Sequence, residues 1–183
     1  MNNARYDRVQ IILHWLIALM SFAMIGLGLF MIELPKQSEL PPGVESVRAF
    51  YFLLHKSIGL TLAGLIVLRL IWRLTHKAPA LPDIVPKWQQ KAAGAVHALF
   101  YMVMVAMPVT GYLQSMYSEY DTKFWGFVLP RLAVADDSMR EVFTASHEFF
   151  AFCLIGLIII HIAAVVKHGL AGTGISERMS LRK

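Results

Sequence analysis

Histidines are the residues of this 183-residue chain whose type and spacing could do chemistry, and there are seven of them. Imidazole is a common metal ligand, and its pKa lets it exchange protons near neutral pH. His147 and His161 form the most informative pair because they are 14 residues apart. In an α-helix that spacing is nearly four turns, or about 21 Å along the axis. Both imidazoles would therefore leave the same helix face at two different levels.

Four long apolar segments must position these histidines. The chain is 57% hydrophobic and only 16% charged, with a mean hydropathy of +0.56. A soluble domain carries about a quarter charged residues, and a disordered chain is polar, so the composition excludes both classes. About 20 apolar residues span a bilayer as a helix, and we predict spanning helices over residues 8–32, 49–74, 90–117 and 141–168. Pro108 lies within the third segment and predicts a kink there rather than an end.

The pattern therefore predicts an all-α integral membrane protein, a four-transmembrane-helix bundle in one domain over residues 1–183. Its charges are distributed unevenly. If both termini share a side, that side has eleven Lys and Arg against three Asp and Glu, a net +8. The opposite side has six cations against nine acids, a net −3, and the two add to the chain's +5. Because Lys and Arg concentrate on the cytoplasmic side, we expect both termini in the cytoplasm and no nucleic-acid binding.

This topology sorts the histidines by depth, since ionisable residues within a membrane are costly and are candidates for function. His76 lies in a cytoplasmic loop, where solvation explains it. The remaining six divide into an outer pair, His55 and His147, and an inner group, His14, His97, His161 and His168.

Two histidines facing each other across a bundle are what a six-coordinate haem b requires. The porphyrin supplies four nitrogens and the protein adds an imidazole above and below. His55 matches the depth of His147, and His14 matches that of His161, so two stacked haems would span the bilayer. A single histidine at a helix end can equally lie at the headgroups or donate to a backbone carbonyl. His97 shares the inner level, and spacing does not choose which two of His14, His97 and His161 would hold a haem.

Other residues near these levels have two interpretations. Lys56, Arg69 and Arg73 are candidates to bind haem propionates, or they extend to the lipid headgroups. The chain's one cysteine, Cys153, excludes a disulfide framework and a cysteine-based metal site, and packing explains it.

The ordered motifs resemble the prokaryotic cytochrome b561 family, the four-helix di-haem membrane cytochromes that include superoxide:ubiquinone oxidoreductase. The resemblance covers nearly the whole chain. It rests on Tyr6…Arg8…Gln10-Ile11…Leu13-His14-Trp15, on His55…Gly59 with Leu68-Arg69-Leu70 and Arg73, on His97…Tyr101…Pro108…Gly111, and on His147-Glu148 with His161.

The resemblance implies the site residues. In that family the outer haem is held by residues corresponding to His55 and His147, and the inner haem by those corresponding to His14 and His161. This assignment leaves His97 without a ligand role. Family members also carry a histidine near a quinone site seven residues after the last ligand, and His168 holds that position. That histidine is often doubled in the family, whereas Gly169 follows it here.

The function expected from these residues is electron transfer across a bacterial inner (plasma) membrane. Electrons would pass through two b haems from a periplasmic donor to ubiquinone, and with superoxide as donor the protein would be an enzyme. The net −3 of the outer side opposes an anionic donor, unless Lys56, Arg131 and Arg140 reverse the field locally. One alternative is the haem b anchor subunit of a periplasmic dehydrogenase or hydrogenase. Another is a transporter of protons or metal ions, which would be colourless.

Overall fold

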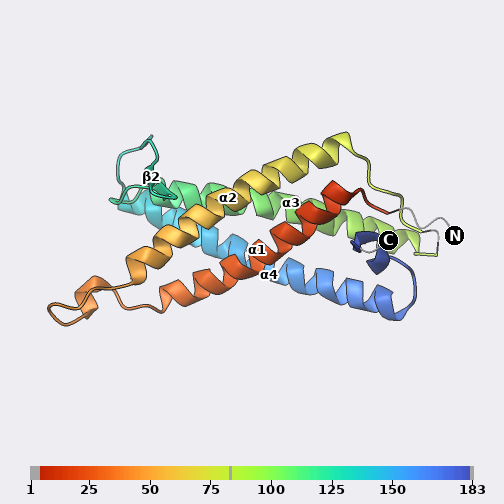
Figure 1. The fold of residues 1–183 in the computed structure, drawn as a ribbon, viewed down its shortest axis with the longest axis horizontal. Helices are drawn as coiled ribbons and strands as arrows, with labels where there is room; N and C mark the ends of the chain where they lie inside the picture. The colour runs from red at the N-terminus through yellow and green to blue at the C-terminus, as the bar shows by residue number, and fades with distance from the viewer. Residues whose placement is uncertain (1–4, 83, 182–183) are drawn as a thin grey trace.

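The computed structural model describes residues 5–82 and 84–181, and four long helices run along its longest axis (Figure 1). These helices are α1 (Arg8–Ile32), α2 (Arg48–Thr75), α3 (Lys87–Met116) and α4 (Asp137–Leu170). Two short 3₁₀ helices, η1 (Gln37–Glu39) and η2 (Ser176–Met179), and two short strands, β1 (Lys123–Phe124) and β2 (Phe127–Val128), complete the described fold. The start of α1 and the end of α4 lie at the same end of the bundle, which we call the terminal end; the other is the distal end.

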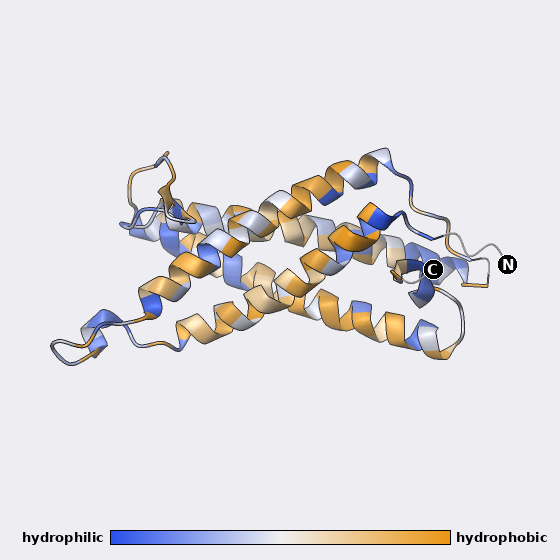
Figure 2. Cartoon of the chain, viewed as in Figure 1, coloured by the Kyte–Doolittle hydropathy of each residue, from blue (hydrophilic) through white to orange (hydrophobic). Residues whose placement is uncertain are grey.

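All four helices are long and apolar enough to cross a membrane, which confirms the predicted four-helix membrane protein. Hydrophobic residues cover the lengths of the helices, and hydrophilic residues gather toward their ends and in the connections (Figure 2). Helix α3 continues through Pro108 to Met116, so the proline does not end it.

Two aspartates explain where the first and last helices begin. The Asp7 carboxylate accepts a hydrogen bond from the Gln10 backbone N–H at 2.9 Å, and Asp136 accepts one from Met139 at 3.0 Å. Each bond satisfies an amide that a helix N-terminus otherwise leaves unpaired. Capping by Asp136 starts α4 at Asp137, four residues before the predicted boundary.

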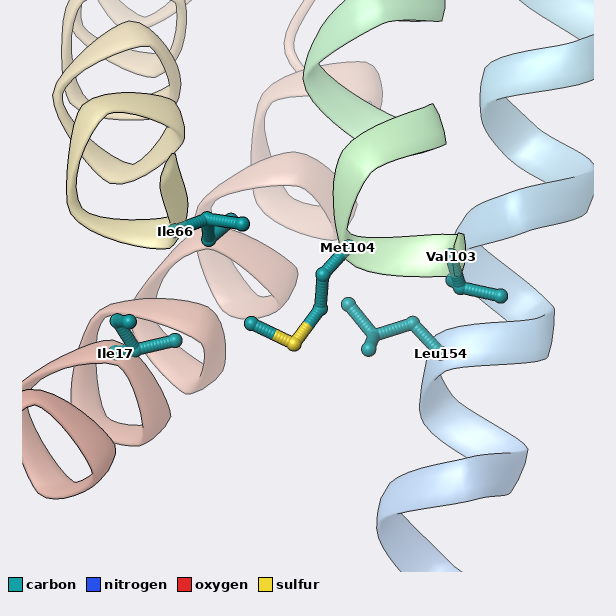
Figure 3. Close-up of a cluster of buried hydrophobic side chains, with 5 residues drawn as sticks. All are labelled: Ile17, Ile66, Val103, Met104 and Leu154. Carbon is teal, nitrogen blue, oxygen red and sulfur yellow. The ribbon is translucent and has the colours of Figure 1, made fainter. Parts of the chain in front are cut away.

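An apolar layer occupies the middle of the bundle, with a contribution from every long helix. It consists of Ile17, Ile66, Val103, Met104 and Leu154, all less than a tenth exposed (Figure 3). Leu154 is seven residues from both His147 and His161. The layer therefore separates two levels of histidine side chains and shields each from the other.

A β-hairpin lies in the connection between α3 and α4. Trp125 and Gly126 both adopt positive φ, 48° and 95°, as a two-residue hairpin turn requires. The Trp125 backbone N–H donates to the Ser57 hydroxyl, and its indole N–H donates to Thr61, each at 3.0 Å. These bonds fasten the hairpin to α2, while the Phe127 side chain stays exposed and available to a membrane interface.

Arg178 joins three separate segments at the terminal end. Its guanidinium is buried and donates to the carbonyls of Pro79 and Ala80 at 2.7 and 3.0 Å. It also lies over the Tyr6 ring, 5.7 Å from the centroid. These contacts tie the start of α1, the connection after α2 and the segment after α4 together, so they hold the terminal end closed.

Candidate functional site

The distal half of the bundle places His55 on α2 opposite His147 on α4. Their ring centroids are 6.3 Å apart, and the ring planes are inclined at 79°. Both side chains are partly buried among the four helices. The structure thus brings together the two histidines that the sequence assigned to one level, and we call them the distal pair.

The other half of the bundle gathers three histidines around one point. His161 on α4 lies 6.1 Å from His14 on α1 and 6.2 Å from His97 on α3, between ring centroids. His161 is therefore common to both possible pairs. The two distances do not separate His14 from His97, so the ambiguity of the sequence pattern persists in the geometry. We call His14 and His161 the terminal pair.

The two pairs suit a haem held between imidazoles. Two imidazoles that approach one another across the bundle would supply the two ligands that a haem iron takes from the protein. The Nδ1 atoms of His14 and His55 are buried and have no hydrogen-bond partner in the described part of the chain. Among the described residues no group of three or more His, Cys, Asp or Glu could hold a bare metal ion. Each of the two pairs would supply two imidazoles to an iron whose other four ligands come from a porphyrin.

Two glycines make room for the rings of the distal pair. A Cβ on Gly28 of α1 would lie 3.4 Å from His55 Cε1, an ordinary contact. A Cβ on Gly111 of α3 would lie only 2.9 Å from His147 Cε1, closer than real side chains approach. The close approach of His147 to α3 consequently depends on glycine at position 111.

The candidate anion-binding cations lie near the levels that the sequence indicated. Arg69 of α2 is close enough to interact electrostatically with His14, His97 and His161, and it lies beside Tyr101. Arg73 lies one turn farther toward the terminal end, and its Nη1 atom is buried without a hydrogen-bond partner among the described residues. These two arginines put positive charge beside the terminal pair, where a carboxylate would be stabilised.

Lys56 is the candidate anion-binding cation at the level of the distal pair. It follows His55 directly on α2 and is partly buried. No acidic partner of Lys56 is found within residues 5–82 and 84–181. Its ammonium is accordingly available to an anionic group beside the distal pair.

The remaining histidines lie apart from the two levels. His168 is in the last turn of α4, with Nδ1 3.4 Å from the Thr173 hydroxyl. His76 stacks on the Trp72 ring at 4.1 Å between centroids and is hydrogen-bonded to Thr75. The contacts of His76 give it a structural role, in agreement with its exclusion at the sequence level.

Sequence reasoning missed the residues that hold His147. Its Nδ1 lies 3.0 Å from the Met107 carbonyl oxygen and 3.3 Å from the Thr110 hydroxyl. A carbonyl oxygen only accepts, so the Nδ1 proton points to it and Nε2 is left for a metal. Pro108 and Gly111 marked this segment in the sequence, but a backbone acceptor has no side-chain signature.

Comparison with known proteins agrees with this geometry. A family model described as "Prokaryotic cytochrome b561" matches residues 5–180. The protein described as "Cytochrome b561 homolog 2" of Escherichia coli (strain K12) is 29% identical over 166 residues, which are 90% of this chain and 84% of that protein. "Cytochrome b561 homolog 1" of the same organism is 26% identical over 167 residues, covering 90% of this chain and 89% of that protein.

Proposed function

This chain belongs to the prokaryotic cytochrome b561 family, and from that premise we propose that it carries electrons through two b haems from a periplasmic donor to ubiquinone. Because of its family membership, the chain is a bacterial membrane protein that transfers electrons by means of haem b. The number of haems, their ligands, the donor, the acceptor and the inner membrane as its location are parts of the proposal.

The observation that carries the proposal is the presence of two facing imidazole pairs on opposite sides of one apolar layer. In the proposal His55 and His147 hold the distal haem, and His14 and His161 hold the terminal haem. A haem bound in this way accepts and releases one electron at its iron. The chain's own contribution is to present the imidazoles at both levels and to exclude water between them with the layer around Leu154.

His14 is preferred to His97 as the partner of His161 because of the family resemblance. Arg69 and Arg73 are the proposed partners of the propionates at this level, and Lys56 is the proposed partner at the distal level.

The orientation follows from charge. The terminal end carries the net +8 and the distal end the net −3, so we place the terminal end in the cytoplasm. Electrons would then enter at the distal pair, on the periplasmic side, and leave at the terminal pair.

Ubiquinone is the proposed acceptor, and His168 is its proposed contact. A histidine can donate a hydrogen bond to a quinone carbonyl and pass a proton as the quinone is reduced. His168 lies in the last turn of α4, seven residues after His161. The nearby Thr173 hydroxyl occupies one side of its ring, which leaves the Nε2 side for a ligand.

Superoxide is the proposed donor that the resemblance implies. Two superoxide anions would give up two electrons and leave as two oxygen molecules, while one ubiquinone takes two electrons and two protons. The charges at the distal end attract the superoxide anion only weakly. Arg131 lies 3.9 Å from Asp121 and Arg140 lies 2.9 Å from Asp137, so neither is free to attract it. Lys56 remains as the local cation near the distal pair.

A reduced-minus-oxidised optical spectrum of the purified protein, with a pyridine haemochrome count of haem per chain, tests the proposal. Two b haems with a split α-band are expected. A colourless protein would contradict it and favour the transporter, and a partner that co-purifies in fixed ratio would favour the anchor subunit.

A further inference from the structure

One helix supplies no proposed ligand yet touches a proposed ligand closely. The His147 ring lies against the segment Met107–Gly111 of α3, and it meets that segment at a backbone carbonyl, a hydroxyl and a glycine. His55 is the other member of the distal pair. Its Nδ1 is buried and has no hydrogen-bond partner among the described residues. The two imidazoles of the distal pair are therefore held in different ways.

The Met107 carbonyl is shared between two donors. The His147 Nδ1–H donates to it at 3.0 Å, and the buried Thr110 hydroxyl lies 3.0 Å from it and 2.8 Å from the Ala106 carbonyl. Pro108 lacks an N–H, but the carbonyl that loses its helical donor is that of Met104, four residues earlier. The Met107 carbonyl has two lone pairs, so it can accept from a side chain as well as from the helix backbone.

Gly111 sets how near the ring comes. An added Cβ would stand 2.9 Å from His147 Cε1 and 3.1 Å from Nδ1, so the ring or the helix would have to move. At Gly28 the corresponding distance to His55 is 3.4 Å, which needs no movement. Of the two rings, it is therefore His147 that comes close enough to its neighbouring helix, α3, to bond with a backbone carbonyl.

We propose that Met107 and Gly111 are positioning residues that orient His147 and fix its proton on Nδ1, and that the Thr110 hydroxyl competes with this bond. The proposal rests on the function proposed above, in which His147 is an axial ligand. A ligating imidazole whose Nδ1–H is held by a carbonyl is more basic, and it stabilises the oxidised iron. The reduction potential of the distal haem then depends in part on the α3 carbonyl that accepts from His147.

Two substitutions should shift that potential in opposite directions. Gly111→Ala pushes the ring away from the carbonyl, so the bond weakens and the distal potential rises. Thr110→Val removes the competing hydroxyl, so the carbonyl accepts more strongly from Nδ1–H and the distal potential falls. The terminal haem should keep its potential in both variants, because the apolar layer separates it from α3 at this point.

The experiment is a redox titration of the purified, haem-loaded protein, with electron paramagnetic resonance of the oxidised low-spin haems. Gly94→Ala is the matched control, since a Cβ at Gly94 of the same helix meets nothing within 4 Å. Gly111→Ala should move one of the two signals or remove one haem, and Gly94→Ala should move neither. Thr110→Val keeps the side chain's shape and stays informative if Gly111→Ala fails to fold.

The outcomes are separable from those of the proposed function. A wild-type protein without two haems overturns the proposed function and this proposal with it. A wild-type protein with two haems, whose potentials and resonance signals do not change in Gly111→Ala and Thr110→Val, overturns the positioning role alone. Shifts in the same direction in both variants overturn it as well.

Discussion

Leu154 lies midway between the two histidines of α4, seven residues from His147 and seven from His161. It is buried in an apolar layer to which all four long helices contribute. Because seven residues make nearly two turns, the leucine shares the face of both imidazoles. One helix face thus carries a polar group, an apolar spacer and a second polar group, at intervals of about 10 Å.

The membrane orientation leads to the first prediction. An alkaline phosphatase fused after Lys183 should be inactive in a bacterial host, because the net +8 of the terminal end holds that end in the cytoplasm, where the reporter does not fold correctly. A fusion within the distal connection around Val44 should be active. An active C-terminal fusion would reverse the orientation and with it the direction of electron flow.

Quinone reduction depends on His168 in the proposed function. His168→Ala should slow the reduction of a water-soluble ubiquinone analogue by about tenfold to a hundredfold, because the proton donor is lost. Stopped-flow oxidation of the reduced haems measures this rate directly. His76→Ala serves as the control, since His76 is occupied by Trp72 and Thr75. Equal rates in wild type and His168→Ala would remove His168 from the quinone site.

Reduction of the haems by superoxide should respond weakly to salt. A basic entrance would raise the on-rate by roughly 10–10³-fold at low ionic strength, and salt would abolish this gain. Here Arg131 and Arg140 are paired with acids, so we expect a flat or rising rate as salt is added. The measurement is the pulse-radiolysis rate against ionic strength, and a steep fall would mean that Lys56 and its surroundings attract the anion after all.

The start of α4 should lose stability in acid. The Ser138 hydroxyl and the Met139 N–H donate to the Asp136 carboxylate and hold its pKa below the ordinary 3.8. Because the folded pKa is depressed, the stabilisation is complete above the unfolded pKa and is lost as the pH falls through the folded pKa. Amide exchange in the first turn of α4, corrected for the intrinsic rate, should show protection falling below about pH 4.

Asp136→Asn is the matched control for this effect. An asparagine side chain also caps a helix, and its amide oxygen accepts a hydrogen bond at every pH in this range. Protection in the variant should not change with pH. If wild type and Asp136→Asn respond to acid alike, another group causes the change.

Much of the bundle could be predicted from the sequence, because its signals are local. Runs of apolar residues predicted the four spans, and the spacing of His147 and His161 placed two imidazoles on one helix face. Depth alone paired His55 with His147, and the ring centroids of these two residues lie 6.3 Å apart in the structure. Depth could not separate His14 from His97, because both lie at the level of His161 and all three rings meet there.

What the sequence did not predict depends on contacts between distant segments. The hairpin at Trp125 has no Asn-Gly or Asp-Gly turn, and its hydrogen bonds reach back to Ser57 on α2. Arg178 looked like one more cytoplasmic cation, yet it is buried against carbonyls about 100 residues earlier in the chain. The Met107 carbonyl that holds His147 is invisible in a sequence, since every residue has one.

The most direct test of the account is the number of haems that each histidine holds. Haem per polypeptide should be two in the wild type and about one in the His147→Ala and His161→Ala variants, each of which removes one axial ligand. His55→Ala should match His147→Ala in its spectrum, His14→Ala should match His161→Ala, and His97→Ala should keep both haems. Two haems retained in His161→Ala, or one lost in His97→Ala, would contradict the proposed ligand pairs.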